Sequence, residues 1–313
     1  MNKVKSSLWQ LRPDEYLNRF LEKGVRSDGR KPEVCRRFKL EATKFGPDFA
    51  SDSCESVKLS IRAGNSSYFS SCTPLIIKTS FEEKTNKLIS NNRIIVNLEF
   101  PSICGFSGNS NYSTYISNTI TECLNDQRVL NKDAFKSVVK NKEIHWVFNI
   151  NIVCLSYDGN SLDYALMLAI ASVINTKLPR HIFWDTNYNW FRFSSDKDIE
   201  KCEDFLVNDV HKDNLNGERG SLTCKPTYFK NIPIFVSFAY LNEKTWVCDP
   251  NSMEDSQGEV VSFCNIDDNN TTLQTQCIAS YPSVGLHCDL NSLVRTVEKR
   301  AKEIREYLLE FKI

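Results

Sequence analysis

The stretch that decides the fold is EIHWVFNINIVCLSYDGNSLDYALMLAIASVIN, residues 143–175. Its first half alternates between apolar and polar side chains, and this period of two predicts a long β-strand with one buried face. The apolar face is formed by Ile144, Trp146, Phe148, Ile150 and Ile152. The opposite face carries His145, Asn149 and Asn151, so we expect His145 to point away from the core side of the strand.

A turn and a helix follow this strand. The tripeptide Asp158-Gly159-Asn160 breaks the alternation and predicts a tight turn. Either Asn160 or Ser161 can cap the next helix, and Asp163 lies in its first turn, where the helix dipole favours an anion. The helix is apolar on nearly every side, so we expect it to be buried inside a domain. It is too short, and its flanks are too polar, to predict a membrane span.

The length, charge balance and cysteine content of the chain are those of an ordinary globular protein. Its 313 residues are enough for a full core and for two domains or subdomains. Lysine plus arginine equals aspartate plus glutamate, 39 each, which gives no support for autonomous, high-affinity binding of nucleic acid. Residues 1–16 contain no apolar signal-peptide core and no apolar run predicts a transmembrane helix, so we expect an intracellular protein. The 12 cysteines form no CxxC pair, so we expect reduced, mostly buried thiols rather than a zinc site or a disulfide framework.

The N-terminal region is predicted to be a docked helix followed by a connector. Residues 12–24 place Pro13 at the first helical position and Gly24 at the stop, and they have one apolar face. Residues 25–33 are rich in turn residues and carry basic side chains. We interpret this connector as a solvated loop, with a contact to RNA phosphates as the alternative.

The rest of the pattern predicts an α+β protein made of two similar units, each a cluster of strands that ends in a helix. In the first unit, strands are expected over 35–42, 57–63, 67–72 and 93–100, with a hairpin turn at Gly64-Asn65, a loop over 101–112 and a helix over 113–125. In the second unit, strands are expected over 232–242, 244–250, 260–265 and 273–279, followed by a helix over 290–311. The expected divisions are an N-terminal arm and connector over 1–30, a first unit over 31–184, an insertion or linker over 185–230 and a second unit over 231–313.

Two polar regions have an open interpretation. The segment 185–230 is charged and irregular, with a short helix over 196–206 as its one candidate element. The C-terminal helix has basic side chains on its polar faces, which we expect to be solvated, with contact to RNA as the alternative. These side chains are Arg295, Lys299, Arg300, Lys302 and Arg305.

Four stretches resemble the RNase PH-like ring subunits of the eukaryotic RNA exosome, and among these the branch that lacks catalytic residues. They are EYLNRFLEKGVRSDGRKPEVCRRFKLEA at 15–42, VKLSIRAGNSSYFSS at 57–71, VFNINIVCLSYDGNSLDYALMLAIASVINTKLP at 147–179 and PIFVSFAYLNEKTWVCDPNSMEDSQGE at 233–259. The third and fourth, in that order and spacing, are the specific ones. The resemblance covers most of the chain outside 185–230, and it implies the two-unit RNase PH-like fold, of the ribosomal protein S5 domain 2-like class.

The resemblance also implies a function. Members of this family form a ring of six RNase PH-like subunits around a channel, through which RNA passes to a nuclease. The implied partners are the other ring subunits, S1/KH-type cap subunits, an associated hydrolytic exoribonuclease and RNA. The implied location is the nucleus, with its nucleolus, and the cytoplasm.

Phosphorolytic members of the family need a phosphate-binding loop, acidic side chains beside the scissile bond and arginines on the RNA backbone. The segment expected to hold the phosphate, 280–293, has one glycine, and the loop and helix start over 101–119 contain no arginine or lysine. Val261 stands where active members carry a further aspartate. The acidic positions that do match are Asp249, Glu254, Asp255 and Glu259. The single glycine over 280–293, the lack of arginine and lysine over 101–119 and the apolar Val261 are three departures from the active members, and together they predict a non-catalytic subunit.

Several assignments stay open at this stage. We expect Asp249 to cap a turn, and Glu254 and Asp255 to lie on a solvated helix or loop. The alternative function is a divergent phosphate-dependent 3′-to-5′ exoribonuclease that uses Asp249 and Asp255, and a free-standing scaffold is a third. No catalytic residue, metal ligand or cofactor is assigned, since His145, His181, His211 and His287 show no metal-ligand spacing. The basic residues of the first half that could contact RNA, which the sequence does not rank, are Arg26, Arg30, Arg36, Arg37, Arg62 and Arg93.

Overall fold

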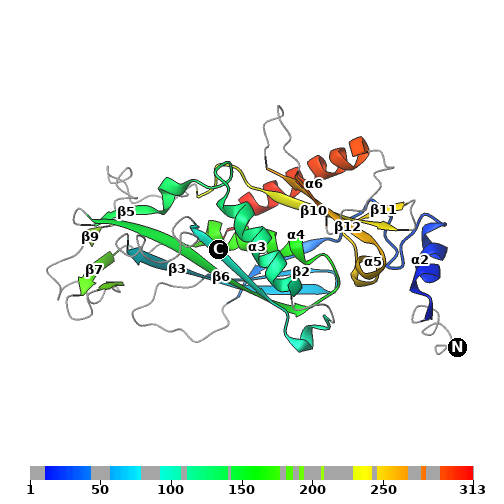
Figure 1. Cartoon of the computed structure of the whole chain (residues 1–313), viewed down its shortest axis with the longest axis horizontal. Coiled ribbons are helices and arrows are strands. Elements are labelled where there is room, and N and C mark those ends of the chain that lie inside the picture. The colour runs from blue at the N-terminus through cyan, green and yellow to red at the C-terminus, as the bar shows by residue number, and fades with distance from the viewer. Residues whose placement is uncertain are drawn as a thin grey trace.

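The fold has two main β-sheets with helices packed on and between them (Figure 1). The computed structural model describes residues 11–43, 57–78, 92–106, 111–139, 142–176, 181–185, 190–193, 206–207, 228–241, 245–266, 276–279 and 290–312. Within these residues no helix has the length and apolar composition needed to cross a membrane. The α+β architecture predicted from the sequence is confirmed.

The first sheet is arranged around β6 (Lys142–Ser156), the strand predicted from the alternating pattern. Its path is β1-β2-β3-β6-β4, and β5 also pairs with β6. The strands are β1 (Phe38–Ala42), β2 (Val57–Ala63), β3 (Ser66–Lys78), β4 (Ile94–Glu99) and β5 (Lys136–Val139). β6 runs antiparallel to β3 and parallel to β4. The predicted hairpin turn joins β2 to β3, where Gly64 adopts a φ of 59° that suits glycine.

The two faces of β6 differ as the alternation predicts. The side chains of Trp146, Phe148, Ile150 and Ile152 are fully buried, whereas that of Ile144 lies outside the described part. On the other face, Asn149 and Asn151 accept hydrogen bonds from the Asn97 amide of β4, at 3.2 and 3.1 Å. His145 shares that face by register but is buried, so at this end of the strand both faces are covered.

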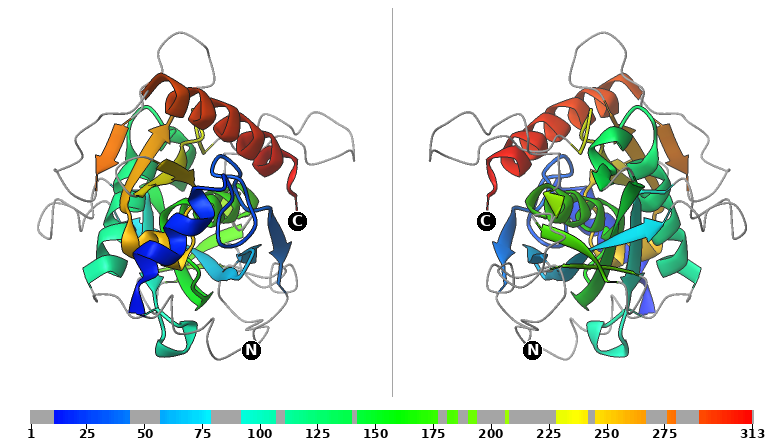
Figure 2. Two further views of the ribbon diagram at one scale, coloured as in Figure 1. Left: turned by 90° about the vertical axis from the view of Figure 1, so that its right-hand side faces the viewer. Right: turned by 90° about the vertical axis from the view of Figure 1, so that its left-hand side faces the viewer.

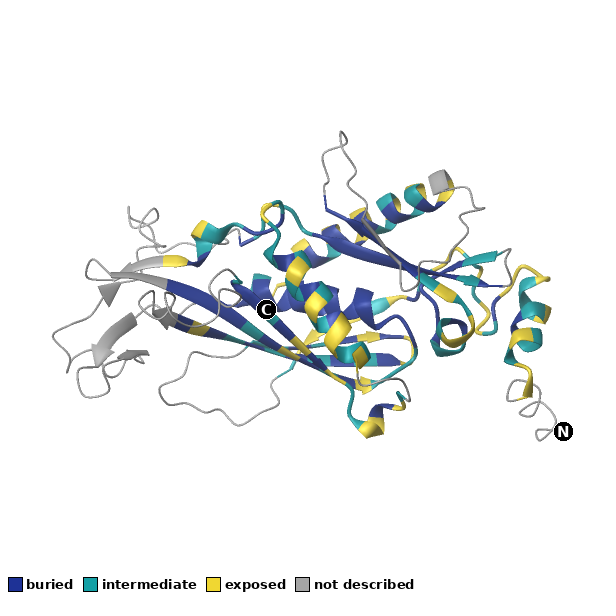
Figure 3. Ribbon diagram, in the orientation of Figure 1, coloured by how far each residue is buried: buried dark blue, intermediate teal, exposed yellow. Residues whose placement is uncertain are grey.

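The helix predicted after the turn is α4 (Ser161–Asn175), and it is buried along its length from Ser161 to Val173. It packs on β2, β3 and β6 of the first sheet and on β10 (Ile234–Leu241) of the second, so it lies between the two sheets (Figures 1 and 3). Its apolar composition on every side follows from this position, because each side meets another element. One continuous apolar core extends from the first sheet through α4 to the second.

The second sheet has the order β11-β10-β12-β13, and α6 (Leu290–Glu310) covers it beside α4 (Figure 2). Its other strands are β11 (Thr245–Cys248), β12 (Glu259–Asn265) and β13 (Gln276–Ala279). The predicted apolar stripe of α6 is confirmed by the buried side chains of Val297, Ala301, Ile304 and Leu308.

The polar faces of α6 are only partly solvated, contrary to the expectation. Arg295, Lys299 and Lys302 are exposed. Arg305 is buried and donates to the backbone carbonyl oxygens of Ile232 and Asn265, at 2.7 and 2.8 Å. An arginine with several donors satisfied in this way fastens the helix to the sheet instead of facing water.

The N-terminal arm docks on the second unit. The predicted helix is α2 (Pro13–Leu21), with Pro13 in the first turn and Leu17 buried. It packs against α5 (Ser252–Gln257), and Leu21 contacts the small apolar cluster of Ala239, Leu241 and Val247.

The described residues after α4 include strands that the sequence did not predict. β7 (His181–Asp185), β8 (Trp190–Phe193) and β9 (Leu206–Val207) form a three-stranded sheet. The strand at 190–193 was missed because a four-residue aromatic run among polar residues is too short to show a period. The helix expected over 196–206 is wrong at its end, where Leu206 is in a strand, and the remaining part lies outside the described residues.

The free edge of β4 is covered by side chains of α3 (Asn111–Asn125). Ser117, Thr121 and Asn125 are one helical turn apart, so they lie in a row along the strand. Their oxygens accept from the backbone N–H groups of Leu98 at 2.9 Å, Val96 at 3.1 Å and Ile94 at 3.2 Å. This row of hydroxyl and amide groups takes the place of a neighbouring strand and protects the edge from pairing with another chain. Two short 3₁₀ segments, η2 (Ser102–Cys104) and η3 (Lys132–Phe135), flank this helix.

We predict that Asn125→Ala destabilises the fold. The Asn125 side chain serves four backbone groups, since it also accepts from Arg93 N and donates to the carbonyls of Ile94 and Thr121. Its loss leaves partly buried groups unsatisfied, and the free energy of unfolding should fall by about 1–3 kcal/mol in denaturant titrations. The matched control is Asn118→Ala on the exposed side of the same helix, which should change it by less than about 0.5 kcal/mol. Equal effects of the two variants would contradict this role of Asn125.

Candidate functional site

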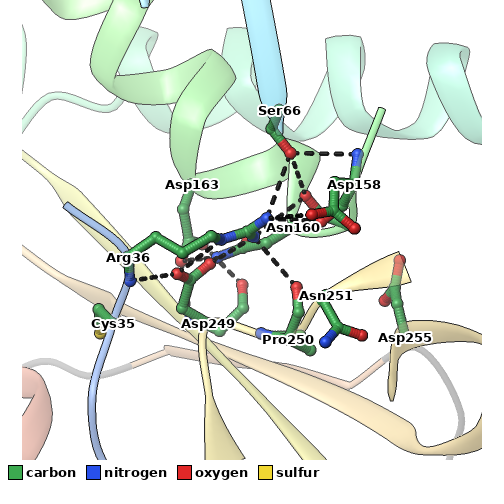
Figure 4. A network of polar contacts seen from close by, with 12 residues as sticks. Cys35, Arg36, Ser66, Asp158, Asn160, Asp163, Asp249, Pro250, Asn251 and Asp255 are labelled. Atoms are coloured by element: carbon green, nitrogen blue, oxygen red, sulfur yellow. Dashed lines mark hydrogen bonds and ion pairs between the residues drawn. The ribbon is translucent and has the colours of Figure 1, made fainter. Parts of the chain in front are cut away.

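The two most specific stretches of the sequence meet in space. The Asp158-Gly159-Asn160 turn lies against the segment that starts at Asp249 and Pro250 (Figure 4). A Cβ atom on Gly159 would lie 2.6 Å from the carbonyl oxygen of Pro250, so only glycine permits this approach. Asn160 and Asp249 have φ values of 55° and 53°, in the left-handed region that asparagine and aspartate tolerate best among residues with a Cβ.

Asp249 is the centre of the site. The residue is 3% exposed, and its carboxylate accepts from the backbone N of Arg36 at 2.7 Å and from the Arg36 guanidinium at 2.7 and 3.0 Å. Arg30 Nη1 donates to it at 3.1 Å and the Asn160 amide at 2.8 Å. Burial by itself would raise the pKa of this carboxyl, but the hydrogen bonds and charge of Arg36, together with Asn160, lower the pKa to about 2. Asp249 is therefore an ionised and fully occupied carboxylate, and not merely the cap of a turn.

Arg36 joins three separate segments. Besides Asp249, its guanidinium donates to the backbone oxygen of Asp158 at 2.6 Å and to that of Pro250 at 3.1 Å (Figure 4). The same group lies 5.3 Å from the ring centre of Tyr164 in α4, a cation–π contact. The start of the first sheet, the turn before α4 and the second unit are thus held by one side chain.

A second buried ion pair lies beside the first. The Arg26 side chain has no exposed surface and donates to both carboxylate oxygens of Glu254, and also to the carbonyl oxygens of Cys248 at 2.7 Å and Asp249 at 3.0 Å. Glu254 also accepts from the backbone N of Asn251, as part of a capping box at the start of α5. The connector over 25–33 was predicted to be solvated, and most of its residues are exposed, but Arg26 and Arg30 depart from the prediction because they pair with acids of the second unit.

Two further aspartates complete the cluster. Asp163 accepts from Ser237 N at 2.9 Å, Ser237 Oγ at 2.6 Å and the Asn160 amide at 2.9 Å, and burial raises its pKa to about 6. Asp255 accepts from the Tyr157 hydroxyl at 2.5 Å, and burial raises its pKa. Asn160 occupies the N-cap position of α4, but its side chain makes no capping bond and holds the two aspartates Asp163 and Asp249. The expectation that Glu254 and Asp255 are solvated is therefore wrong for Glu254, which is buried, and holds only in part for Asp255, which is half-buried.

Few polar side chains of this cluster are free to bind a ligand or to take part in a reaction. In the described part of the chain, no group of three or more histidine, cysteine or acidic side chains is placed to hold a metal ion. Glu259 is exposed, and Val261 is buried as an apolar residue of β12. The segment expected to hold phosphate lies outside the described residues from 280 to 289.

Of the six basic candidates for RNA contact, Arg37 and Arg62 are exposed, whereas Arg26, Arg36 and Arg93 are buried and Arg30 is paired with Asp28 and Asp249.

We predict unequal costs for removing the charge of Asp249 and of Asp255. Asp249→Asn removes the nearest counter-charge of the buried Arg36 guanidinium and leaves only the more distant Asp158 carboxylate at 3.6 Å, so the free energy of unfolding should fall by about 3–5 kcal/mol. Asp255→Asn keeps an oxygen that can accept from Tyr157, and should cost less than about 1.5 kcal/mol. Denaturant titrations at neutral pH measure both variants, and equal losses would show that Asp249 is not the centre of the network.

We also predict a pH dependence that arises from Asp163. Because burial raises the folded-state pKa of this acid from 3.8 to about 6, folding favours its protonated form and loses stability as pH rises between these values. Asp163→Asn lacks this loss, so its stability relative to the wild type should improve by up to about 3 kcal/mol between pH 4 and pH 7. The control Asp133→Asn changes an exposed carboxylate, and its stability should vary with pH in the same way as that of the wild type across this range. If the difference in free energy of unfolding between Asp163→Asn and the wild type stays constant from pH 4 to pH 7, Asp163 is not the source of the pH dependence.

Comparison with known proteins places this geometry in a known fold. The chain is similar to the archaeal exosome of Archaeoglobus fulgidus with RNA bound to its active site, at a TM-score of 0.62 and 17% identity, over 94% of this chain and 96% of the other. An archaeal exosome core gives a TM-score of 0.62 at 16% identity, over 95% and 96% of the two chains.

In sequence, the chain is 26% identical to exosome complex component rrp43 of Schizosaccharomyces pombe over 183 residues, which cover 56% of this chain and 61% of that protein. The match thus spans about three fifths of the length of the curated relative. No protein-family model matches the chain. The resemblance predicted from the sequence is confirmed at the level of fold: the chain has the RNase PH-like architecture of exosome core subunits.

Proposed function

We propose that this chain is a non-catalytic structural subunit of an exosome ring and helps to form the channel that guides RNA to a 3′-to-5′ exoribonuclease. The observation that carries the proposal is the occupied carboxylate of Asp249. Both of its oxygens accept hydrogen bonds from Arg36 or Asn160, and Arg30 lies on the same group. A carboxylate neutralised in this way inside the protein has no oxygen left for a divalent ion or a proton of the reaction.

The alternative, phosphate-dependent cleavage by Asp249 and Asp255, requires two available acids in one site. Asp255 is held by Tyr157, and burial favours its neutral form. The buried Val261 adds no acidic group. In the described part of the segment over 101–119 there is no cationic side chain that could hold the RNA backbone. The alternative therefore lacks support at each of these positions.

A structural role agrees with the way the two units are joined. The ion pairs Arg26–Glu254 and Arg36–Asp249 link the connector and the residues before β1 to the second unit, and α4 is buried between the sheets. A subunit fastened in this way presents fixed surfaces to its neighbours. Near-zero net charge suits a shared channel, because each subunit needs to supply only a few phosphate contacts.

The partners and location follow from the same proposal. The S. pombe relative is named as a component of the exosome complex, which supports other RNase PH-like ring subunits as direct neighbours. RNA in the shared channel, S1/KH-type cap subunits and an associated hydrolytic exoribonuclease complete the proposed assembly. The proposed location is the nucleus, including the nucleolus, and the cytoplasm.

The proposal predicts that the chain has no phosphorolytic activity. The purified chain, incubated with oligoribonucleotide, inorganic phosphate and magnesium, should release no nucleoside diphosphates, and a ring assembled with it should show the same activity as one carrying Asp255→Asn. Co-expression with RNase PH-like subunits should yield a stable complex of similar-sized chains, identified by native mass spectrometry.

Two outcomes would contradict the proposal. Release of nucleoside diphosphates that is abolished by Asp255→Asn would support the phosphorolytic alternative. A monomer that stays soluble and enters no complex with RNase PH-like subunits would instead support a free-standing scaffold.

A further inference from the structure

Two pairs of cysteine thiols bridge the first and second units. Cys35, at the end of the connector, has its Sγ 3.0 Å from the Sγ of Cys248 at the end of β11. Cys123 of α3 and Cys264 of β12 have their Sγ atoms 3.8 Å apart. All four are free thiols, and each pair joins residues more than a hundred positions apart in the chain.

The two thiols of the Cys35–Cys248 pair differ in their exposure, so a small oxidant can reach one of them more easily than the other. Cys35 is partly exposed, whereas Cys248 is buried with 1% of its surface accessible. The hydrogen bond with Cys248 lowers the pKa of the Cys35 thiol, opposed by burial and assisted by the charge of Arg300. A partly exposed thiol with an enhanced thiolate fraction is the one that a small oxidant attacks, and the buried neighbour is placed to resolve the product.

The Cys123–Cys264 pair has a longer sulfur–sulfur distance and more acidic surroundings. Its hydrogen bond and burial raise the pKa of Cys123, and the nearby Asp126 adds to this effect. The two thiols border a cavity of about 240 Å³ that Glu122 and Asp126 also line. Acidic surroundings disfavour a thiolate, so this pair is a matched control inside the same chain.

We propose that Cys35 and Cys248 form an oxidation site, at which a peroxide converts the two thiols into a disulfide that fastens the connector to β11. The sulfur atoms need to approach by only about 1 Å to reach the disulfide bond length of about 2.05 Å. Cys35 immediately precedes Arg36, and Cys248 immediately precedes Asp249. The disulfide therefore closes beside the Arg36–Asp249 ion pair and makes that junction covalent.

The reaction balances in two steps. The Cys35 thiolate attacks one oxygen of hydrogen peroxide, the O–O bond breaks, and the released hydroxide takes up a proton as water, which leaves Cys35 as a sulfenic acid. The Cys248 sulfur then attacks the Cys35 sulfur, the S–O bond breaks, and the departing hydroxide takes the Cys248 proton as a second water. The peroxide gains two electrons, and the two cysteines together lose two.

The test uses the full-length chain, reduced and then freed of reductant. A near-stoichiometric amount of hydrogen peroxide is added to the native protein, free thiols are blocked with N-ethylmaleimide at intervals, and the peptides are analysed by mass spectrometry. We expect a Cys35–Cys248 linked peptide that forms faster than a Cys123–Cys264 peptide, because its sulfur atoms lie 3.0 Å apart instead of 3.8 Å and the pKa of Cys35 is lowered whereas that of Cys123 is raised. The oxidised protein should unfold at a higher denaturant concentration, and a reductant should reverse this shift.

Variants separate this site from general oxidation. Cys35→Ser should remove both the linked peptide and the gain in denaturant resistance, and Cys248→Ser should leave Cys35 as a sulfenic acid that dimedone traps. Since Cys248 is buried and its variant could unfold, the partly exposed Cys35→Ser alone is sufficient for the comparison. Equal rates for the two pairs, or a Cys35–Cys248 link that appears only after denaturation, would overturn the proposal.

Discussion

The fold depends on one buried ion pair, between the Arg36 guanidinium and the Asp249 carboxylate. Taking two charges out of water costs several kcal/mol each, and this cost is offset only when the geometry is good and the remaining donors and acceptors are satisfied. Both conditions hold, since Arg36 also binds carbonyl oxygens of the DGN turn and Asp249 also binds Asn160 and Arg30. Removing either partner would leave an unpaired buried charge where the two units meet. The ion pair therefore helps to fix the position of one sheet relative to the other.

The same constraint decides which chemistry the site can perform. An acid acts on phosphate or binds a cation through free oxygen lone pairs in reach of solvent. Asp249 is buried under arginine donors, and Glu254 is buried against Arg26. Asp249 and Glu254 thus form internal ion pairs that join the connector region to the second unit. A role in assembly is therefore the one that we propose for such a network.

The sequence predicted the parts of the fold that follow from local periodicity. The strand, turn and helix of 143–175 and the strand at 57–63 lie where the patterns place them, because side-chain alternation and a DGN turn are local properties. The site was not predictable in the same way. Arg26 and Arg36 look like any basic residues of a polar connector, and their partners lie 228 and 213 positions away. Neither a period nor a motif encodes such a pairing, so a solvated loop and a buried ion network have the same local signature.

The internal use of arginine also limits how this chain can contact RNA in the proposed ring. Arg26, Arg30 and Arg36 are committed to acids, and Arg305 is committed to backbone oxygens. The exposed cations that remain among the candidates are Arg37, Arg62, Arg295, Lys299 and Lys302. Each phosphate neutralised adds a little less than one unit to the salt dependence of binding, so these five candidates by themselves would contribute a shallow salt slope. In the ring that we propose, several such subunits would hold RNA through many weak contacts, which would allow the strand to move through the channel instead of binding tightly at one subunit.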